Sequence, residues 1–325
     1  MDQAQDVLLV TGGAGFIGSH FINNYARSRP HARIMNLDAL YYAGSEEHVD
    51  AEVRVSSRYS FHKLNLRDFD ALVKIVSTNA ITHVIHFAAQ SHVTRSFNDS
   101  REYTLDNVVG THNLLEACRL HAPSLKKFVH VSTDEVYGES MLGRGTTSKT
   151  EQSVLCPTNP YAATKAGAEL IAQSYAHSWT MPIVITRGNN VYGPNQHDEK
   201  VIPCFIKRLK RGQKVQIEGT GDCVRAFMHA EDAAQAFQLV LEKGRIGEIY
   251  NLGCDQGAEI SIMDLAIMIV GLVRGKEVNA IDWIELKEDR PFNDKRYFIS
   301  NQKIKSLGWK QTVTLEDGLS RLALS

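Results

Sequence analysis

The sequence predicts an α/β protein in which helices cover both faces of a parallel β-sheet. Short apolar runs alternate with longer amphipathic runs through the first half of the chain, which is typical of strand–helix repeats. The runs expected to form buried strands are Val7–Val10, Arg33–Leu37, Tyr59–Leu64, Val84–Ala88, Phe128–Ser132 and Ile183–Thr186. The helices expected between them are Gly15–Arg27, Asp68–Ser77, Glu102–His121 and Tyr161–Ser178. Ligands of such sheets bind beyond the carboxyl ends of the strands, so we expect the functional site there.

The pattern loosens after Thr186, which predicts a second, smaller lobe. Glycine and proline punctuate residues 188–203, and later helices are expected near Pro203–Arg211, Glu231–Lys243 and Ser261–Val273. We predict a sheet domain at residues 1–187 and a C-terminal substrate-binding lobe at residues 188–325 that closes over the sheet edge. The boundary is soft, since no linker of disordered composition separates the halves and segments can cross it.

Composition excludes several classes of protein. The 325 residues include 36 Lys and Arg against 37 Asp and Glu, so no global field attracts nucleic acid or an anionic membrane. The five cysteines are scattered and form no C-x-x-C pair, so neither a disulfide framework nor a metal site is expected. No apolar stretch approaches the ~20 residues of a membrane span, and the start lacks the basic region of a signal peptide. We therefore expect a reduced, cytoplasmic protein.

A glycine-rich segment follows the first predicted strand and opens the first predicted helix. Gly12, Gly15 and Gly18 fit G-x-x-G-x-x-G, and Gly13 also completes G-x-G-x-x-G. Glycine is needed where backbone approaches a pyrophosphate closely, and the helix N-terminus offers unpaired N–H groups to the phosphates. Asp38 ends the second strand twenty residues after Gly18, where a carboxylate accepts ribose hydroxyls and repels a 2′-phosphate. The segment predicts a Rossmann-type, doubly wound sheet that binds NAD; the alternative is a purely structural turn.

Tyr161 and Lys165 are four residues apart on a predicted helix and so share one face. A tyrosine with an unperturbed pKa near ~10 is a poor base at neutral pH, and a nearby ammonium lowers that pKa. The pair can then remove a hydroxyl proton while a nicotinamide accepts hydride from the same carbon. Taken alone, the same spacing is equally typical of a surface helix pair.

Two adjacent acids end the fifth predicted strand, in Ser132-Thr133-Asp134-Glu135. Buried without partners they would be costly, and in a strand-end loop they could simply be a solvated turn or a helix cap. At the mouth of a nicotinamide site they instead offer an acid and a base side by side. A hydroxyl, a tyrosine–lysine pair and two carboxylates that converge on one place form a specific constellation.

These motifs resemble the extended short-chain dehydrogenase/reductase family, and more narrowly its nucleotide-sugar 4,6-dehydratases. The resemblance covers nearly the whole chain and includes the glycine loop, Asn36-Leu37-Asp38, His86-Phe87-Ala88-Ala89-Gln90-Ser91-His92-Val93, Ser132-Thr133-Asp134-Glu135-Val136-Tyr137-Gly138, Asn159-Pro160-Tyr161-Ala162-Ala163-Thr164-Lys165, Asn189-Asn190-Val191-Tyr192-Gly193-Pro194 and Glu199-Lys200-Val201-Ile202-Pro203. Members that only epimerise at C4 usually lack both acids of the pair, and decarboxylases usually keep only the glutamate.

The resemblance implies a three-step reaction on UDP-glucose or dTDP-glucose. Tyr161 takes the C4 hydroxyl proton while hydride passes to NAD, and Thr133 hydrogen-bonds the C4 oxygen. Glu135 then removes the C5 proton, and Asp134 protonates the departing C6 hydroxyl. Hydride finally returns to C6, so that NAD is regenerated, and Lys165 also holds the nicotinamide ribose.

The same resemblance assigns binding residues. Those expected to bind NAD are Gly12, Gly15, Phe16, Ile17, Gly18, Asp38, Asn65, Leu66, Phe87, Ala88, Ala89, Ser132, Tyr161 and Lys165. Those expected to bind the nucleotide sugar are Ser91, Thr133, Asn190, Lys200, Val201, Val215, Ile217, Arg225 and Arg290. Asn65, Thr94 and Asn293 depart from the residues common in the family, and none of the three belongs to the catalytic cluster.

Several alternatives stay open at this level. The stretches Thr186–Asn190 and Arg290–Asp294 look most like the dehydratase region of plant rhamnose synthases, which favours UDP-glucose, but one methyl separates thymine from uracil and no motif decides between the two. The rival functions are a nucleotide-sugar epimerase or decarboxylase, a non-catalytic NAD sensor and an interaction protein. Helices Glu102–His121 and Tyr161–Ser178 match the family's dimer interface, so a homodimer is expected, although their apolar stripes are also compatible with ordinary core.

Overall fold

A seven-stranded parallel sheet forms the centre of the molecule. The computed structural model describes residues 6–142, 146–289 and 292–324. In the sheet the strand order is β10-β6-β5-β4-β1-β2-β3, and every neighbouring pair is parallel. The strands are β1 (Val7–Thr11), β2 (Arg33–Asp38), β3 (Tyr59–Lys63), β4 (His83–His86), β5 (Lys127–Thr133), β6 (Ile183–Gly188) and β10 (Ile249–Leu252). The predicted α/β class and parallel sheet are therefore confirmed.

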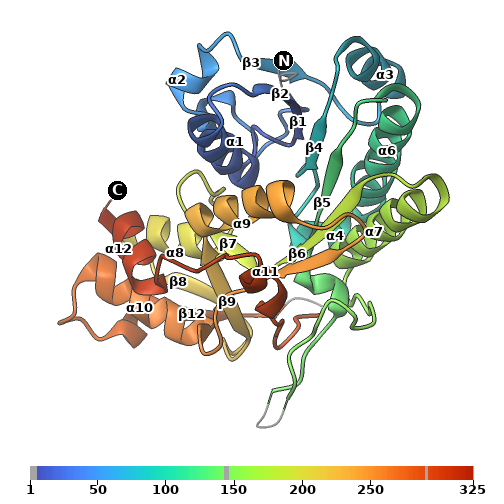
Figure 1. The fold of residues 1–325 in the computed structure, drawn as a ribbon. Coiled ribbons are helices and arrows are strands. Elements are labelled where there is room, and N and C mark those ends of the chain that lie inside the picture. The colour runs from blue at the N-terminus through green and yellow to red at the C-terminus, as the bar shows by residue number, and fades with distance from the viewer. Residues whose placement is uncertain (1–5, 143–145, 290–291, 325) are drawn as a thin grey trace.

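Helices cover both faces of this sheet, which gives three layers (Figure 1). On one face lie α1 (Phe16–Ser28) and α9 (Ala230–Lys243), and on the other α3 (Phe69–Thr78), α6 (Gly110–His121) and α7 (Pro160–Trp179). Side chains of a strand alternate between faces, so Leu8 and Val10 enter one apolar cluster while Leu9 enters the other. The central strands contribute side chains to both clusters because they are apolar at consecutive positions.

The expected helix Glu102–His121 is present but is not uniform. It consists of α5 (Ser100–Tyr103), a π-helical turn η2 (Thr104–Val109) and α6 in direct succession. The periodic pattern predicts one helix, and hydrophobic periodicity does not distinguish a single wider turn from an α-helical one. The shorter elements of the first half are η1 (Glu46–His48), α2 (Ala51–Arg54), α4 (Val93–Asn98) and η3 (Asp134–Tyr137).

The second lobe has its own apolar core and two small sheets. One sheet pairs β9 (Val224–His229) with β7 (Asn190–Tyr192) and β11 (Glu259–Ser261), and the other pairs β8 (Val215–Glu218) with β12 (Ile284–Lys287). The lobe's helices are α8 (Val201–Lys210), α10 (Ile262–Arg274), η4 (Ala280–Trp283) and α12 (Leu315–Leu324), and α11 (Gln302–Ser306) packs beside β10. Strand β10 follows residue 188 yet pairs in the large sheet, and helix α9 packs on that sheet, so the chain crosses between the two parts more than once.

One buried ion pair anchors α7 to the sheet. Glu169 on α7 and Arg187 at the end of β6 have side chains that are 0% and 3% exposed. Arg187 Nε lies 3.1 Å from each carboxylate oxygen, and its Nη2 also donates to Glu169. Because Tyr161 and Lys165 lie on the same helix, this pair also sets where those two side chains stand relative to β5.

We expect Glu169→Gln to lower the free energy of unfolding by about 3–5 kcal/mol, because it leaves the Arg187 charge buried without its counter-ion. Urea unfolding followed by circular dichroism measures the loss. Arg321→Gln is the control: it breaks an exposed 3.4 Å pair with Glu231 and should cost no more than about 1 kcal/mol. Equal losses for the two variants would contradict the anchoring role.

No helix in the part of the chain that the structure describes is long and apolar enough to cross a membrane.

Candidate functional site

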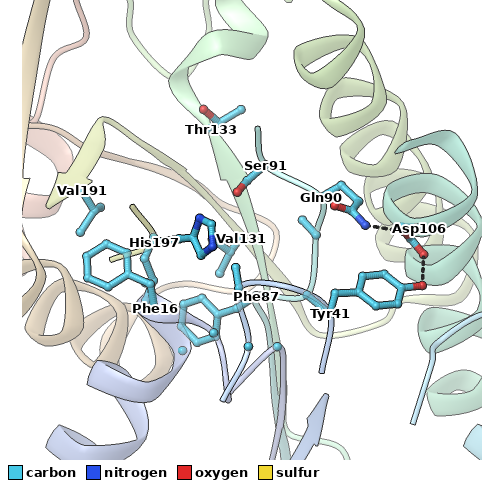
Figure 2. A pocket seen from close by; sticks show the side chains of 18 of the residues that line it. Phe16, Tyr41, Phe87, Gln90, Ser91, Asp106, Val131, Thr133, Val191 and His197 are labelled. Carbon is cyan, nitrogen blue, oxygen red and sulfur yellow. Dashed lines mark hydrogen bonds between the residues drawn. The ribbon is translucent and has the colours of Figure 1, made fainter. Parts of the chain in front are cut away.

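One large pocket lies at the carboxyl ends of the central strands and is closed on one side by the second lobe. Residues that end or follow β1, β2, β4, β5 and β6 line it, together with the start of α1 and the loop before α8. Figure 2 shows side chains from both parts, among them Phe16, Phe87, Thr133 and His197, which surround a common space. The pocket is where the rule for parallel sheets places a ligand.

The glycine loop brings bare backbone to this pocket. Gly12 has a φ of +73°, and a Cβ added there would lie 2.5 Å from the backbone nitrogen of Ala88. A Cβ on Gly18 would lie 2.3 Å from the carbonyl oxygen of Gly12. Gly15 is the N-cap of α1, and no side chain among the described residues caps this helix start. The N–H groups of the first turn are therefore available to an anion at the pocket.

Polar side chains gather where β2 and β3 end. Both Asp38 oxygens accept backbone N–H groups, from Ala14 at 3.0 Å and from Leu40 at 2.9 Å. Burial raises the pKa of Asp38, and these backbone hydrogen bonds oppose that rise. Asn65 Nδ2 donates to the Tyr41 hydroxyl at 2.8 Å.

Asp106 closes this end of the pocket. It accepts hydrogen bonds from Tyr41 at 3.3 Å and from Gln90 at 3.0 Å, as Figure 2 shows.

The two adjacent acids at the end of β5 have different partners. Asp134 is 2% exposed, and its Oδ2 accepts from Asn189 Nδ2 at 2.6 Å. Burial, and next the charge of Glu135, raise the pKa of Asp134 to about 7. Glu135 Oε2 accepts from Asn159 Nδ2 at 3.0 Å, and burial raises the pKa of Glu135 as well. The pair thus offers a carboxyl that is partly protonated at neutral pH beside a second carboxylate.

Tyr161 and Lys165 both line the pocket from the buried face of α7. Burial raises the pKa of Tyr161 above its usual value, and the Glu135 charge adds to the rise, while a hydrogen bond with Thr133 opposes it. Lys165 Nζ donates to the Val131 carbonyl at 2.6 Å, and burial lowers the pKa of the ammonium to about 8. Helix α7 is placed by its N-cap Asn159, whose Oδ1 accepts from Ala162 N at 2.9 Å and whose Nδ2 holds Glu135.

Most residues expected at the site lie in this pocket. It is lined by all the residues predicted to be catalytic or to bind NAD: Gly12, Gly15, Phe16, Ile17, Gly18, Asp38, Asn65, Leu66, Phe87, Ala88, Ala89, Ser132, Thr133, Asp134, Glu135, Tyr161 and Lys165. Of the residues predicted to bind the sugar nucleotide, Ser91, Thr133, Asn190 and Lys200 also line it. Ser132 Oγ is buried without a hydrogen-bond partner among the described residues, so it is a donor that faces a ligand site.

Four other predicted residues do not line the pocket. Val215 and Ile217 are 0% and 1% exposed and belong to the lobe's apolar core, so only their backbone groups could contact a ligand. Val201 packs against the same core. Arg225 lies behind the acids, where its charge lowers the pKa of both Asp134 and Glu135, and its Nη2 donates to the Asp294 carbonyl at 2.7 Å.

Arg290 lies outside the residues that the structure describes.

The structure also brings in residues that sequence analysis missed. Tyr42 donates to Glu199 Oε1 at 2.7 Å, and Lys200 Nζ donates to the Ser91 carbonyl at 2.9 Å, so two bonds join the lobe to the sheet domain across the pocket. Asn189 donates a hydrogen bond to Asp134, and Asn159 donates one to Glu135. The Asn-Pro signal at residues 159–160 predicts a helix cap but not this second role, and nothing in the local pattern points to Asn189 or Tyr42.

No group of three or more His, Cys, Asp or Glu side chains suited to a metal ion occurs within the described ranges.

The sheet, the glycine loop and the paired Tyr161 and Lys165 define a Rossmann-type protein of the short-chain dehydrogenase/reductase class. Within that class, the family model described as GDP-mannose 4,6 dehydratase matches residues 9–322, and the chain belongs to this family. This confirms the resemblance to nucleotide-sugar 4,6-dehydratases that the motifs predict.

Similar proteins agree with this assignment. A trifunctional UDP-glucose 4,6-dehydratase/UDP-4-keto-6-deoxy-D-glucose 3,5-epimerase/UDP-4-keto-L-rhamnose-reductase of Arabidopsis thaliana is 44% identical over 319 residues, which cover 97% of this chain and 46% of the relative. The chain thus spans about half the length of that relative. The dTDP-D-glucose 4,6-dehydratase of Homo sapiens is 42% identical over 316 residues, covering 97% of this chain and 88% of the relative. The dTDP-glucose 4,6-dehydratase of Streptomyces venezuelae, solved with NAD bound, superposes with a TM-score of 0.90 at 37% identity and covers 98% and 96% of the two chains.

Proposed function

We propose that the protein is an NAD-dependent nucleotide-sugar 4,6-dehydratase, a hydro-lyase that converts UDP-glucose to the 4-keto-6-deoxy sugar with loss of water. dTDP-glucose is the alternative substrate. The observation that carries the proposal is that Asp134 and Glu135 line the same pocket as Thr133, Tyr161 and the glycine loop. An epimerase or a decarboxylase has no use for both acids, and a binding protein needs neither the acids nor the tyrosine.

The residues present fit NAD. The glycine loop leaves no room for a Cβ at Gly12 or Gly18, so backbone N–H groups of the first turn of α1 face the diphosphate directly. Asp38 accepts the adenosine ribose hydroxyls and repels a 2′-phosphate. Lys165 holds the nicotinamide ribose. When bound, NAD supplies the hydride acceptor that takes hydride from C4 and returns it to C6.

The side chains around the sugar divide the proton transfers among them. Tyr161 takes the C4 hydroxyl proton, and Thr133 hydrogen-bonds the C4 oxygen. Glu135 takes the C5 proton, which the new C4 ketone has made acidic. Asp134 gives its proton to the C6 oxygen as the C6–O bond breaks, so that water leaves. An acid whose pKa is about 7 suits the last task, because a large share of it carries a proton at neutral pH.

NAD and the sugar nucleotide bind mainly to different parts of the chain. Residues 1–187 bind NAD, and residues 188–325 supply most of the sugar-nucleotide contacts. Asn190, Lys200 and Ser91 lie in the pocket where the lobe meets the sheet domain. The diphosphate and nucleoside are assigned to Arg225, Arg290, Val201 and the β8 backbone at Val215 and Ile217.

Proton NMR of the product tests the proposal. The purified protein, supplied with NAD, is incubated with UDP-glucose and in parallel with dTDP-glucose. A new C6 methyl signal is the expected result, with the larger kcat/KM for UDP-glucose. Appearance of a galactose or pentose product without a methyl signal would overturn the dehydratase in favour of an epimerase or a decarboxylase.

Gly12→Ala is expected to weaken NAD binding at least about tenfold, or roughly 1.4 kcal/mol, because a Cβ at positive φ and 2.5 Å from Ala88 N would displace the backbone that is proposed to face the diphosphate. Titration calorimetry with NAD measures the change. Gly247→Ala is the matched control, since it has a φ of +82° but nothing within 4 Å of an added Cβ. If Gly12→Ala bound NAD as the wild type does, the loop would not be the diphosphate site.

We further propose that the protein is a cytoplasmic homodimer. The outer faces of η2, α6 and α7 expose Val109, Leu120, Leu170 and Trp179, which are between 38% and 56% exposed. Apolar side chains on two neighbouring helices suit a helical interface between two copies. All five cysteines are free thiols, which suits a reducing compartment. Light scattering coupled to size exclusion measures the mass, and a monomer at micromolar concentration would contradict the dimer.

A further inference from the structure

Glu135 has a second polar neighbour, which comes from far along the chain. Tyr297 lies near the C-terminal end of the chain and is 6% exposed. Its hydroxyl lies 3.3 Å from Glu135 Oε2 and 2.5 Å from Asp294 Oδ2. The guanidinium of Arg225 stacks 4.6 Å from the centre of its ring and fixes the ring in this place. One phenol hydroxyl thus bridges two carboxyl groups, of which Glu135 lines the pocket and Asp294 does not.

The Tyr297 hydroxyl carries a single proton, which can be shared with only one of the two carboxyl groups. A tyrosine hydroxyl donates one hydrogen bond and accepts others, so Tyr297 cannot donate to both carboxylates at once. The shorter contact assigns its proton to Asp294, and its oxygen then faces Glu135 as an acceptor. A proton on Glu135 completes the chain, with Glu135 donating to Tyr297 and Tyr297 donating to Asp294. Burial and the two carboxylates raise the pKa of Tyr297, so the phenol stays neutral and passes a proton only by giving one as it takes one.

The far end of the bridge leads away from the pocket. Asp294 is 3% exposed and accepts from the hydroxyl of Thr158 at 2.7 and 2.9 Å. Thr158 is only half-buried, so it connects Asp294 to the surface. Asn159, the next residue, holds Glu135 Oε2 from the other side. The base is therefore held by one donor and joined through Tyr297 to a second carboxylate outside the pocket.

We propose that Tyr297 is a positioning residue for Glu135 and the first link of a proton relay from Glu135 to Asp294. In the forward step the C5–H bond breaks and its proton forms an O–H bond on Glu135. Glu135 passes that proton to the Tyr297 oxygen, the original Tyr297 proton moves to Asp294, and Glu135 is again a carboxylate. The reverse transfer brings a proton back to Glu135 and then to C5. The inference rests on the proposed dehydratase function, because it assigns a path to the C5 proton.

The relay predicts where the hydrogen at C5 comes from. The reaction is run in deuterated water with UDP-glucose that carries protium at C5, and the product is examined by NMR. In the wild type the relay exchanges the C5 proton with solvent, so the product carries deuterium at C5. In Tyr297→Phe, which keeps the ring on Arg225 and removes only the hydroxyl, most product molecules should retain protium at C5. We also expect kcat to fall about tenfold with KM unchanged, as for the loss of one hydrogen bond to a charged group.

A merely slower enzyme does not mimic this result, because a longer-lived intermediate gives more time for exchange and raises the deuterium content. Tyr250→Phe is the matched control: it removes the hydroxyl of another buried tyrosine, in β10, and should leave C5 as deuterated as in the wild type. If Tyr297→Phe does not fold, Asp294→Asn decides, since it removes the proton acceptor and should also retain protium.

The C5 deuterium content and the C6 methyl signal distinguish loss of the relay from absence of dehydratase activity. Wild-type deuterium content at C5 in the Tyr297→Phe product, or in the Asp294→Asn product when the first variant is unfolded, overturns the relay while the dehydratase stands. Loss of deuterium in Tyr250→Phe would also overturn it, because the effect would then not be specific to the bridge. Absence of a methyl signal with the wild type overturns the dehydratase itself.

Discussion

Tyr161→Phe is expected to lower kcat by about 10²- to 10⁴-fold, because it removes the group that is proposed to take the C4 hydroxyl proton. Oxidation at C4 is the first step of the proposed reaction, so neither a keto intermediate nor a methyl product should accumulate. The NAD affinity should fall far less than kcat, because Lys165 is proposed to keep the contact with the nicotinamide ribose. Steady-state assays of methyl formation and titration with NAD measure the two quantities separately.

The environment of Tyr161 explains why this single hydroxyl matters so much. Burial and the neighbouring carboxylates hold its pKa above the usual value, so the phenol loses its own proton, and can then take one from the sugar, only when positive charge is brought close to it. In the proposed mechanism, Lys165, one helical turn further on α7, and the nicotinamide of bound NAD would provide that charge. Tyr175→Phe is the control: it removes a hydroxyl from the same helix, bonded to Glu116 at 2.7 Å, and should leave kcat near that of the wild type. Equal losses for the two variants would remove Tyr161 from the chemistry.

Asp134→Asn is expected to stop the reaction after the first step, with reduced cofactor accumulating on the enzyme. Asparagine fills the same space, but it cannot give a proton to the departing C6 hydroxyl. The expected loss in the elimination rate is about 10²- to 10⁴-fold, as for removal of a positioned general acid. Stopped-flow absorbance of the reduced nicotinamide after mixing with substrate shows a rise that does not decay. Asp70→Asn, an exposed carboxylate on α3, should show the rise and the decay of the wild type.

The pKa of Asp134 should set the pH dependence of the elimination step. Burial and the Glu135 charge raise the pKa of Asp134 to about 7, and the acid must carry its proton to act. The protonated fraction falls as pH rises through that value, so the decay of reduced nicotinamide should slow above about pH 7. Decay that stays constant from pH 6 to about 9, two units above that pKa, would contradict the acid role of Asp134.

Much of this fold could be predicted because the relevant signals are local. The apolar runs of β1 to β6 are short, bounded and separated by amphipathic helices, and all six expected strands are present. The pocket could be predicted for the same reason, since parallel strands end at one edge of the sheet, Asp38 and Thr133 end their strands, and the glycine loop follows β1. Strand β10 was missed because its four residues lie in the second half of the chain, and only its pairing with β6 places them in the large sheet.

What could not be predicted depends on contacts between distant segments. The raised pKa of Asp134 arises from burial in the packed site and from the Glu135 charge, and the Asn189 side chain that opposes the rise lies 55 positions away in the chain. Tyr297 reaches Glu135 across 162 positions, from a segment without helical or strand periodicity. Val215 and Ile217 were expected at the substrate, but alternation in β8 turns both side chains into the lobe core. A residue pattern shows that a side chain is apolar, and the packed lobe decides which way it faces.

In the proposed reaction, hydrogen moves from C4 to C6 within one sugar while water is lost. The most direct measurement uses UDP-glucose labelled with deuterium at C4, incubated in ordinary water with the protein and NAD but no other reductant. We expect a 4-keto product whose C6 methyl group carries the deuterium. Deuterium that stays at C4 of a galactose product, or a methyl group without deuterium, would contradict it.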